Sequence, residues 1–339
     1  MIRLSVLDQS PIRKGCSPSD AINETLILAK KTEKLGYYRF WVAEHHSHPM
    51  FAGTSPEILV GQLASITSTI RVGSGGVMLS HHSPLKVAEN FRVLESIYPG
   101  RIDLGLGRAP GADRITSSAL SLSSEDFNVD RFPQKVRDLR CWLSGVHHEE
   151  HPFRKVVAMP SGESVPQIWL LGSSDQGAII ASHFGIPFCF AHFISGNGVS
   201  EVIGYYKKNF KPSTDKKEPL GSVAVFVVCA ESEEEAKYLA ESRPLMMLKS
   251  RRGEGGGVPT PEESLSYDWS ELERNFADSI RRRTIIGNPE QVKDKLLDLS
   301  RKCEVDEFVI VNTLHSFEAR LKTYELLSKV FELKKKQIV

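Results

Sequence analysis

The feature that most constrains this chain is a regular alternation of short apolar runs with amphipathic helical patterns. Eight apolar runs occur, at residues 4–10, 37–43, 70–76, 101–107, 166–172, 186–193, 222–230 and 307–313. Continuous apolar runs are typical of parallel strands that are buried on both faces. Eight β-α units fit either a barrel or an open doubly wound sheet. A length of 339 residues, and the lack of a dinucleotide fingerprint in the first unit, favour an α/β fold of the (β/α)8 TIM barrel type.

Several helix starts are marked by a polar residue followed by proline. Ser17-Pro18, Ser55-Pro56, Ser83-Pro84 and Asn288-Pro289 each precede a segment with apolar residues on one face. A polar N-cap and a proline in the first turn are the expected signature of a helix N-terminus. We predict that Gly36 ends the first of these helices.

Two stretches break the rhythm of the barrel. After the fourth predicted strand the next convincing helix begins only near Asp130, so residues 108–129 are predicted to form an insertion. Residues 250–283, between the seventh strand and the last helices, are rich in Gly, Pro and charge. We interpret them as a mobile, lid-like surface segment within a single domain that spans residues 1–339.

The composition excludes several classes of protein. The chain has 43 basic and 42 acidic residues, a formal charge of +1, which gives no overall field to attract nucleic acid or an anionic membrane. Its five cysteines contain no C-x-x-C pair, which argues against a disulfide framework or a zinc knuckle. The first apolar stretch reaches Asp8 too early for a signal peptide, and residues 223–230, the longest apolar run, are too few to span a bilayer. We therefore expect a cytoplasmic protein with a small-molecule partner.

The ends of the predicted strands carry polar and glycine residues, where a barrel places its active site. The second strand ends in Glu44, His45 and His46, with His48 shortly after. Adjacent strand residues point to opposite faces, so His45 and His46 cannot both face one pocket, and we expect one of them to be structural. A hydrolase-type metal site at His46 and His48 is an alternative, but Pro49 places them in a loop and no metal is the preferred prediction.

The fifth predicted strand ends in Gly172, Ser173 and Ser174, directly before a helix. Backbone N–H groups, the helix dipole and two hydroxyls would suit a phosphate. Simple capping of the helix by Ser173 or Ser174 explains the same pattern. Gly75 and Gly76, at the end of the third strand, are suited to a flat ligand that lies against bare backbone.

Several motifs together resemble those of the luciferase-like flavin-dependent monooxygenases, most closely their group 1 oxidoreductase branch. The motifs run along nearly the whole chain: LSVLDQSPI, LGYYRFWVAEHH, FAGTSPEILVGQLAS, IRVGSGGVMLSHHSPLKVAENFRVLESIYPGRIDLGLGRAPG, IWLLGSSDQGA, GNPEQV and RLKTYELLS. The specificity lies in their order and spacing. One departure is Gly107, which stands where the light-emitting subunit has a reactive cysteine, so light emission is not implied.

The resemblance implies a β/α barrel that binds reduced FMN at its C-terminal mouth. A separate NAD(P)H:flavin reductase would supply FMNH2, and a C4a-peroxyflavin would insert one oxygen atom from O2 into a small organic substrate. A homodimer is implied as well. His45 matches the family's catalytic histidine, and Glu44 is its expected orienting partner.

The resemblance also implies a set of cofactor-binding residues. Gly75-Gly76 matches a non-prolyl cis peptide behind the flavin ring. Ser173 and Ser174, with the backbone after Gly172, would hold the FMN phosphate, and Arg108 would serve the phosphate or the anionic flavin. Three alternatives stay open: a flavin-storage protein without turnover, an oxidoreductase that uses the deazaflavin F420, and a metal-dependent hydrolase.

Overall fold

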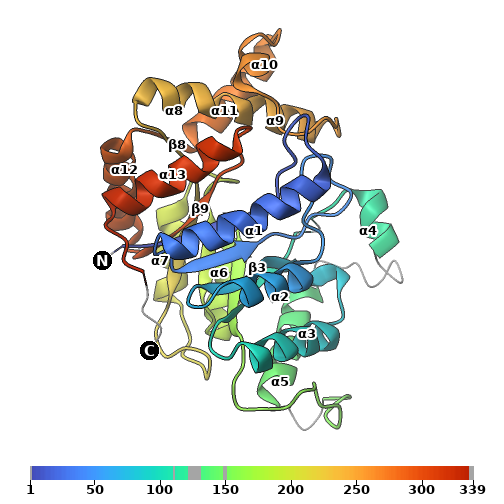
Figure 1. Cartoon of the computed structure of the whole chain (residues 1–339). Helices are drawn as coiled ribbons and strands as arrows, with labels where there is room; N and C mark the ends of the chain where they lie inside the picture. Colours follow the sequence, from blue (N-terminus) through green and yellow to red (C-terminus); the bar gives the residue numbers. More distant parts are fainter. Residues whose placement is uncertain (1, 110, 121–130, 148–150, 336–339) are drawn as a thin grey trace.

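The computed structural model describes residues 2–109, 111–120, 131–147 and 151–335. Within these residues nine strands form one parallel sheet (Figure 1): β1 (Arg3–Asp8), β2 (Arg39–Val42), β3 (Arg71–Met78), β4 (Ile102–Gly107), β5 (Gln167–Gly172), β6 (Phe188–Ala191), β7 (Gly221–Cys229), β8 (Thr284–Gly287) and β9 (Glu307–Val311). Eight of them close into a barrel in the order β1-β2-β3-β4-β5-β6-β7-β9, with β9 paired to β1. The predicted (β/α)8 TIM barrel is confirmed.

Helices surround the barrel on its outside (Figure 1). They are α1 (Pro18–Lys34), α2 (Pro56–Ile66), the short 3-10 helix η1 (Leu79–His81), α3 (Pro84–Ile97), α4 (Arg114–Leu120), α5 (Phe132–Ser144), α6 (Asp175–Phe184), α7 (Val199–Lys208), α8 (Glu233–Ala240), α9 (Ser242–Arg251), α10 (Pro261–Leu265), α11 (Glu271–Arg282), α12 (Pro289–Cys303) and α13 (Phe317–Val330). The four polar-Pro helix starts predicted from the sequence are confirmed. Gly36, with a φ of +87°, follows the C-cap of α1 as expected.

The strand β8 was not predicted. It is only four residues long and stands directly before the Asn288-Pro289 helix start. β6 pairs with the first half of β7, from Gly221 to Ala224, and β8 pairs with the second half, from Phe226 to Cys229. The new strand therefore continues the barrel wall along β7 beyond the C-terminal end of β6.

The two predicted insertions contain helices. In the first, α4 lies within the described residues, whereas residues 121–130 lie outside them. The lid-like segment 250–283 holds α10 and α11, and each of these begins with a capping box, at Thr260 and at Ser270. Its mobility stays a prediction.

A buried ionic network fills the barrel at the N-terminal ends of the strands. Arg39 donates from Nε to Glu307 Oε1 (2.7 Å) and from Nη1 to Asp103 Oδ2 (2.8 Å), and all three side chains are at most 1% exposed. Each charge has an opposite partner, which is what burial of charged groups requires. This end of the barrel is closed, so a ligand must enter at the C-terminal ends.

Two further observations bear on the expectations from composition. All five cysteines are free. Among the described helices, none has the length and apolar character needed to cross a bilayer.

Candidate active site

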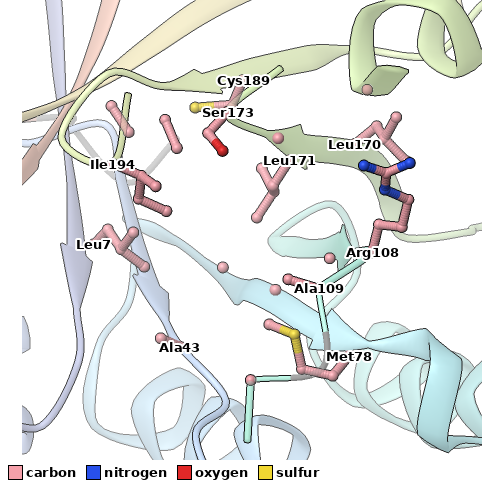
Figure 2. Close-up of a pocket in the computed structure, with 18 of the residues that line it drawn as sticks. Leu7, Ala43, Met78, Arg108, Ala109, Leu170, Leu171, Ser173, Cys189 and Ile194 are labelled. Atoms are coloured by element: carbon pink, nitrogen blue, oxygen red, sulfur yellow. The ribbon is translucent and has the colours of Figure 1, made fainter. Parts of the chain in front are cut away.

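A cavity of about 240 Å³ opens at the C-terminal ends of the strands (Figure 2). Seven of the eight predicted site residues line it: His45, Gly75, Gly76, Arg108, Gly172, Ser173 and Ser174. They come from the ends of β2, β3, β4 and β5. Most of the other lining side chains are apolar, among them Leu7, Trp41, Ala43, Leu171, Phe193 and Ile194. The cavity is therefore a dry pocket with a few convergent polar groups, as ligand sites usually are.

His45 follows β2 and faces this cavity. Its ring packs against Phe51, with centroids 4.7 Å apart, and lies 5.8 Å from the ring of His48. The Nδ1 atom of His45 is buried and has no hydrogen-bond partner among the described residues. Burial, and then the neighbouring His48, lower the pKa of His45 to about 4. His45 is thus neutral at physiological pH, with one ring nitrogen available to a ligand.

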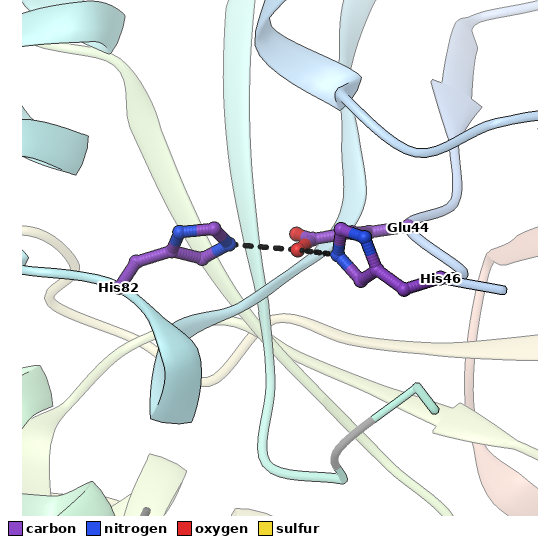
Figure 3. A group of neighbouring side chains, drawn as sticks. All are labelled: Glu44, His46 and His82. Atoms are coloured by element: carbon purple, nitrogen blue, oxygen red, sulfur yellow. Dashed lines mark hydrogen bonds and ion pairs between the residues drawn. The ribbon is translucent and has the colours of Figure 1, made fainter. Parts of the chain in front are cut away.

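Glu44 does not line the cavity and does not orient His45. Its Oε1 lies 2.7 Å from Nε2 of both His46 and His82, and its Oε2 accepts a hydrogen bond from the backbone N–H of Met78 at 2.8 Å (Figure 3). The expected contact with His45 is absent from the hydrogen bonds of the described residues. The expectation is corrected: Glu44 ties the end of β2 to the end of β3 and to the residue that follows η1.

The electrostatics of this group agree with a structural pairing. Burial disfavours the charge of Glu44, but hydrogen bonds from His46 and His82 outweigh it and lower the carboxyl pKa to about 2. The hydrogen bond to Glu44 raises the pKa of His82. His46 is thus structural, as expected, and His82 is the partner that sequence reasoning missed. Only its position just before the Ser83-Pro84 helix start marked it in the sequence.

The metal alternative at His46 and His48 is not supported by the geometry. His48 Nε2 lies 3.0 Å from Ser250 Oγ, its Nδ1 accepts from the N–H of Met50 at 3.1 Å, and its ring stacks on Phe51. His46 is instead bound to Glu44. Among the described residues, the group whose spacing would suit a metal is Glu44, His46 and His82, with ligand atoms within 4.8 Å of one another. Both histidine nitrogens are already hydrogen-bonded to Glu44 Oε1, so the group needs no ion to be satisfied.

The opposite part of the cavity carries unpaired donors. Ser174 occupies the N-cap position of α6 but makes no side-chain capping hydrogen bond, and the Ser173 hydroxyl has no hydrogen-bond partner within the described parts of the chain. Arg108 likewise has no acidic partner within 4 Å there. Gly172 lies against the first turn of α6, since a Cβ atom at this position would be in van der Waals contact with Gly177 Cα at 3.4 Å. A guanidinium, two hydroxyls and a helix N-terminus together can bind a phosphate.

The Gly75-Gly76 peptide bond is cis, as the family resemblance implies. A Cβ atom on Gly75 would lie 2.6 Å from Leu7 Cδ1, and one on Gly76 would lie 2.7 Å from the carbonyl oxygen of Gly105. Close packing of the neighbouring strands therefore requires glycine at both positions. The result is a stretch of bare backbone on the cavity wall.

Comparisons with known proteins agree with the fold. The family model for luciferase-like monooxygenases matches residues 2–306. The Bacillus subtilis (strain 168) protein YwcH is 45% identical over 98% of this chain and 99% of its own, and N-acetyl-S-alkylcysteine monooxygenase of the same organism is 38% identical over 97% and 98%. The chain belongs to the luciferase-like monooxygenase family. It is accordingly an oxidoreductase of the monooxygenase class.

Solved structures show the same architecture. The structure of apo-MsnO8 superposes with a TM-score of 0.88 at 33% identity and covers 98% of this chain and 99% of that one. Two more distant neighbours show the fold alone. One is the oxygenating constituent of 3,6-diketocamphane monooxygenase from Pseudomonas putida in complex with FMN (TM-score 0.69, 19% identity, 97% of each chain). The other is an F420-dependent secondary alcohol dehydrogenase (TM-score 0.70, 13% identity, 97% and 98%).

Proposed function

We propose that this chain is the oxygenating component of a two-component, FMN-dependent monooxygenase that acts on a small organic substrate. The observation that carries the proposal is the convergence of seven predicted flavin-site residues, from four different strands, on one apolar cavity. When bound, reduced FMN supplies the chemistry that activates O2 and delivers one oxygen atom. The remaining work falls to the residues of the chain.

The residues present fit FMN. The side chains of Arg108, Ser173 and Ser174, which have no hydrogen-bond partner among the described residues, offer donors to its phosphate, and the bare backbone at Gly75-Gly76 offers a flat surface to its ring. The apolar walls exclude water, which strengthens polar interactions inside and limits side reactions. His45 presents an unpartnered Nδ1 in this dry environment. We assign to it the transfer or retention of a proton at that atom.

The partner molecules are part of the proposal. Since the chain carries no nicotinamide fingerprint, a separate NAD(P)H:flavin reductase would supply the reduced cofactor. The relative that is named for N-acetyl-S-alkylcysteine makes thioethers of this kind candidate substrates. FMN is preferred to F420 because the family motifs of this chain are those of the FMN branch.

We also propose a homodimer formed through α2 and α3. These helices pack side by side, with the position of Gly61 against Leu94. Three large apolar side chains on them are exposed: Ile58 at 70%, Val93 at 46% and Ile97 at 60%. Exposed apolar side chains of this size on two neighbouring helices are what a surface covered by another subunit would show.

Stopped-flow absorbance tests the proposed function. Anaerobic protein with FMNH2 is mixed with oxygenated buffer, and free FMNH2 serves as the reference. We expect a transient flavin species, distinct from the reduced and oxidised forms, that persists longer with the protein than without it. Oxidation at the rate of free FMNH2 would contradict the proposal and favour flavin storage or an F420-dependent reaction.

A further inference from the structure

Three basic side chains gather behind one wall of the cavity, without an acidic partner among the described residues. They are His192, which follows β6, Arg243 of α9, and Arg283, which follows α11; we call them the cationic cluster. No carboxylate lies within 4 Å of any of them among the described residues. Burial lowers the pKa of all three groups, and mutual repulsion adds to the effect at His192 and Arg243. The two guanidinium groups therefore carry positive charge that no carboxylate among the described residues balances.

Arg243 is the most deeply placed member. It is 3% exposed, and its guanidinium carbon lies 3.9 Å from the centroid of the Phe226 ring. It donates from Nη2 to the carbonyl of Phe193 (2.9 Å), and from Nη1 to Thr284 Oγ1 and to the carbonyl of Ile280 (3.5 Å). These are three neutral acceptors for five N–H groups. Elsewhere in this barrel, the buried Arg39 has two carboxylates, so Arg243 lacks the compensation that the fold provides for another buried arginine.

The other two members have unpartnered polar atoms. Arg283 Nε and His192 Nδ1 are both buried, and neither has a hydrogen-bond partner within the described residues. Arg283 uses Nη1 to donate to the carbonyl of Ile194. Buried donors without acceptors are uncommon in folded proteins, and each one needs an explanation. An anion that accepts from both arginines would provide one.

The cluster lies directly behind residues that face the cavity. Phe193 and Ile194, whose carbonyl oxygens the two arginines hold, both line it. In the view of Figure 2, Ile194 and Arg108 stand on opposite sides of the cavity. The cationic cluster is therefore separate from the donors that we propose for the FMN phosphate.

We propose that the cationic cluster binds a carboxylate group of the organic substrate and so orients the substrate with its other end toward the flavin. The inference rests on the proposed function. Two guanidinium groups can donate paired hydrogen bonds to a carboxylate, and the low dielectric of the wall strengthens the attraction. A neutral amide of the same shape gains neither the charge interaction nor the full set of hydrogen bonds.

Calorimetric titration of the protein, loaded with oxidised FMN, tests the inference without any oxygen chemistry. The probes are matched acid and amide pairs: octanoate and octanamide, 3-phenylpropanoate and its amide, and N-acetyl-S-methylcysteine and its amide. We expect at least one acid to bind roughly tenfold or more tightly than its amide, as a charge-assisted hydrogen bond would produce. If no acid in the panel binds more tightly than its amide, the inference is overturned.

Variants locate the effect at the cluster. In Arg283→Gln and Arg243→Gln the preference for the acid should fall to less than threefold, while Arg283→Lys should retain part of it. Arg282→Gln is the matched control, since Arg282 is exposed and adjacent in sequence, and it should keep the full preference. The affinity for the amide shows whether a variant has lost carboxylate recognition or has only disturbed the structure. A structural disturbance weakens the binding of acid and amide equally, and that result would contradict the inference. The titration needs no FMNH2, so its result tests the carboxylate site alone. A negative stopped-flow experiment would contradict the proposed function and can be told apart from a negative titration.

Discussion

Glu44 and His82 are 38 positions apart in the chain, yet His82 Nε2 lies 2.7 Å from Glu44 Oε1. The same oxygen is 2.7 Å from His46 Nε2, while Oε2 of Glu44 accepts from the N–H of Met78. Met78 and His45 both line the cavity. The carboxylate of Glu44 thus holds in place two segments from which the site is built, although it does not itself face a ligand.

The pairing of His82 with Glu44 should make stability depend on pH. The pKa of His82 is raised in the folded protein, so this contribution is fully present below the unfolded value of about 6.5 and is lost as pH rises through the folded value. We expect His82→Ala to lower the free energy of unfolding by about 1 kcal/mol near pH 6, since His82 is one-third exposed, and by less near pH 8.5. Urea unfolding at the two pH values measures the difference.

The variant His82→Gln is the control for this prediction. Its amide can still donate to Glu44 but carries no charge, so its effect should be smaller and nearly independent of pH. A loss of stability in His82→Ala that is larger at pH 8.5 than at pH 6 would show that the ionised pair is not the cause.

His45→Ala should separate flavin binding from productive oxygenation. Because we propose that His45 handles a proton and does not hold the phosphate, we expect unchanged FMN affinity, roughly a hundredfold less oxygenated product and a corresponding release of hydrogen peroxide. Product and peroxide per FMNH2 oxidised are the measurements. The exposed His183, on α6, provides a control substitution to Ala that should retain wild-type coupling. Wild-type coupling in His45→Ala would remove this residue from the mechanism.

The pH profile of the reaction gives an independent check on His45. Burial lowers its pKa to about 4, so the ring stays neutral from pH 5.5 upward. We therefore expect His45 to cause no inflection near pH 6.5 in the plot of activity against pH. The profiles of the wild type and of His45→Gln should have the same shape in this range. Because the pKa of His45 is lowered, its protonation should reduce activity only in more acidic buffer, where the fold itself loses stability. An inflection near 6.5 that depends on His45 would place this histidine in a wetter environment than the structure gives it.

The barrel and the position of seven site residues in the cavity were predictable from the sequence, because both depend on local patterns. Buried parallel strands appear as apolar runs, and a barrel places the ends of those runs at one mouth, so residues such as His45 and Ser173 could be located without any contact information. The contacts of Glu44 could not be predicted in this way. Alternation along β2 says which face a side chain takes, but the register of β2 against β3 and η1 decides that His82 lies opposite the carboxylate.

The sequence also could not predict which charged residues in the segment after β7 are buried. Arg243 and Arg283 lie in a stretch rich in charge, where the sequence does not distinguish a solvated arginine from one enclosed by α9 and β8. The strand β8 was missed because four residues give too short a pattern to separate from a loop. The missed strand matters for the site, since Thr284 at its start accepts from Arg243.

Arg108→Gln should weaken the binding of FMN tenfold or more. The guanidinium has no acidic partner in the described structure, so its removal takes a charge-assisted hydrogen bond from the phosphate and none from the fold. The melting temperature of the free protein should therefore be unchanged. Riboflavin, which lacks the phosphate, is the matched ligand, and its affinity should be the same for the variant and the wild type. Equal losses of affinity for FMN and riboflavin would contradict a phosphate role for Arg108. The variant Ser173→Asp should likewise weaken the binding of FMN and not of riboflavin, because its carboxylate repels the phosphate.

Ile97→Asp should convert a homodimer into a monomer. Ile97 is 60% exposed on α3, one turn after Val93, and Ile58 is exposed on the neighbouring helix α2, so burial of both helices against a second copy would remove three large apolar side chains from water. A carboxylate placed there would be desolvated without a partner, whereas in the monomer it stays in water and the fold is unaffected. Sedimentation velocity at micromolar concentration distinguishes the two states. Leu272→Asp is the control, because Leu272 is 83% exposed on α11, away from the proposed interface, and should leave the dimer intact. A wild-type monomer, or an Ile97→Asp protein that still sediments as a dimer, would show that α2 and α3 are not the interface.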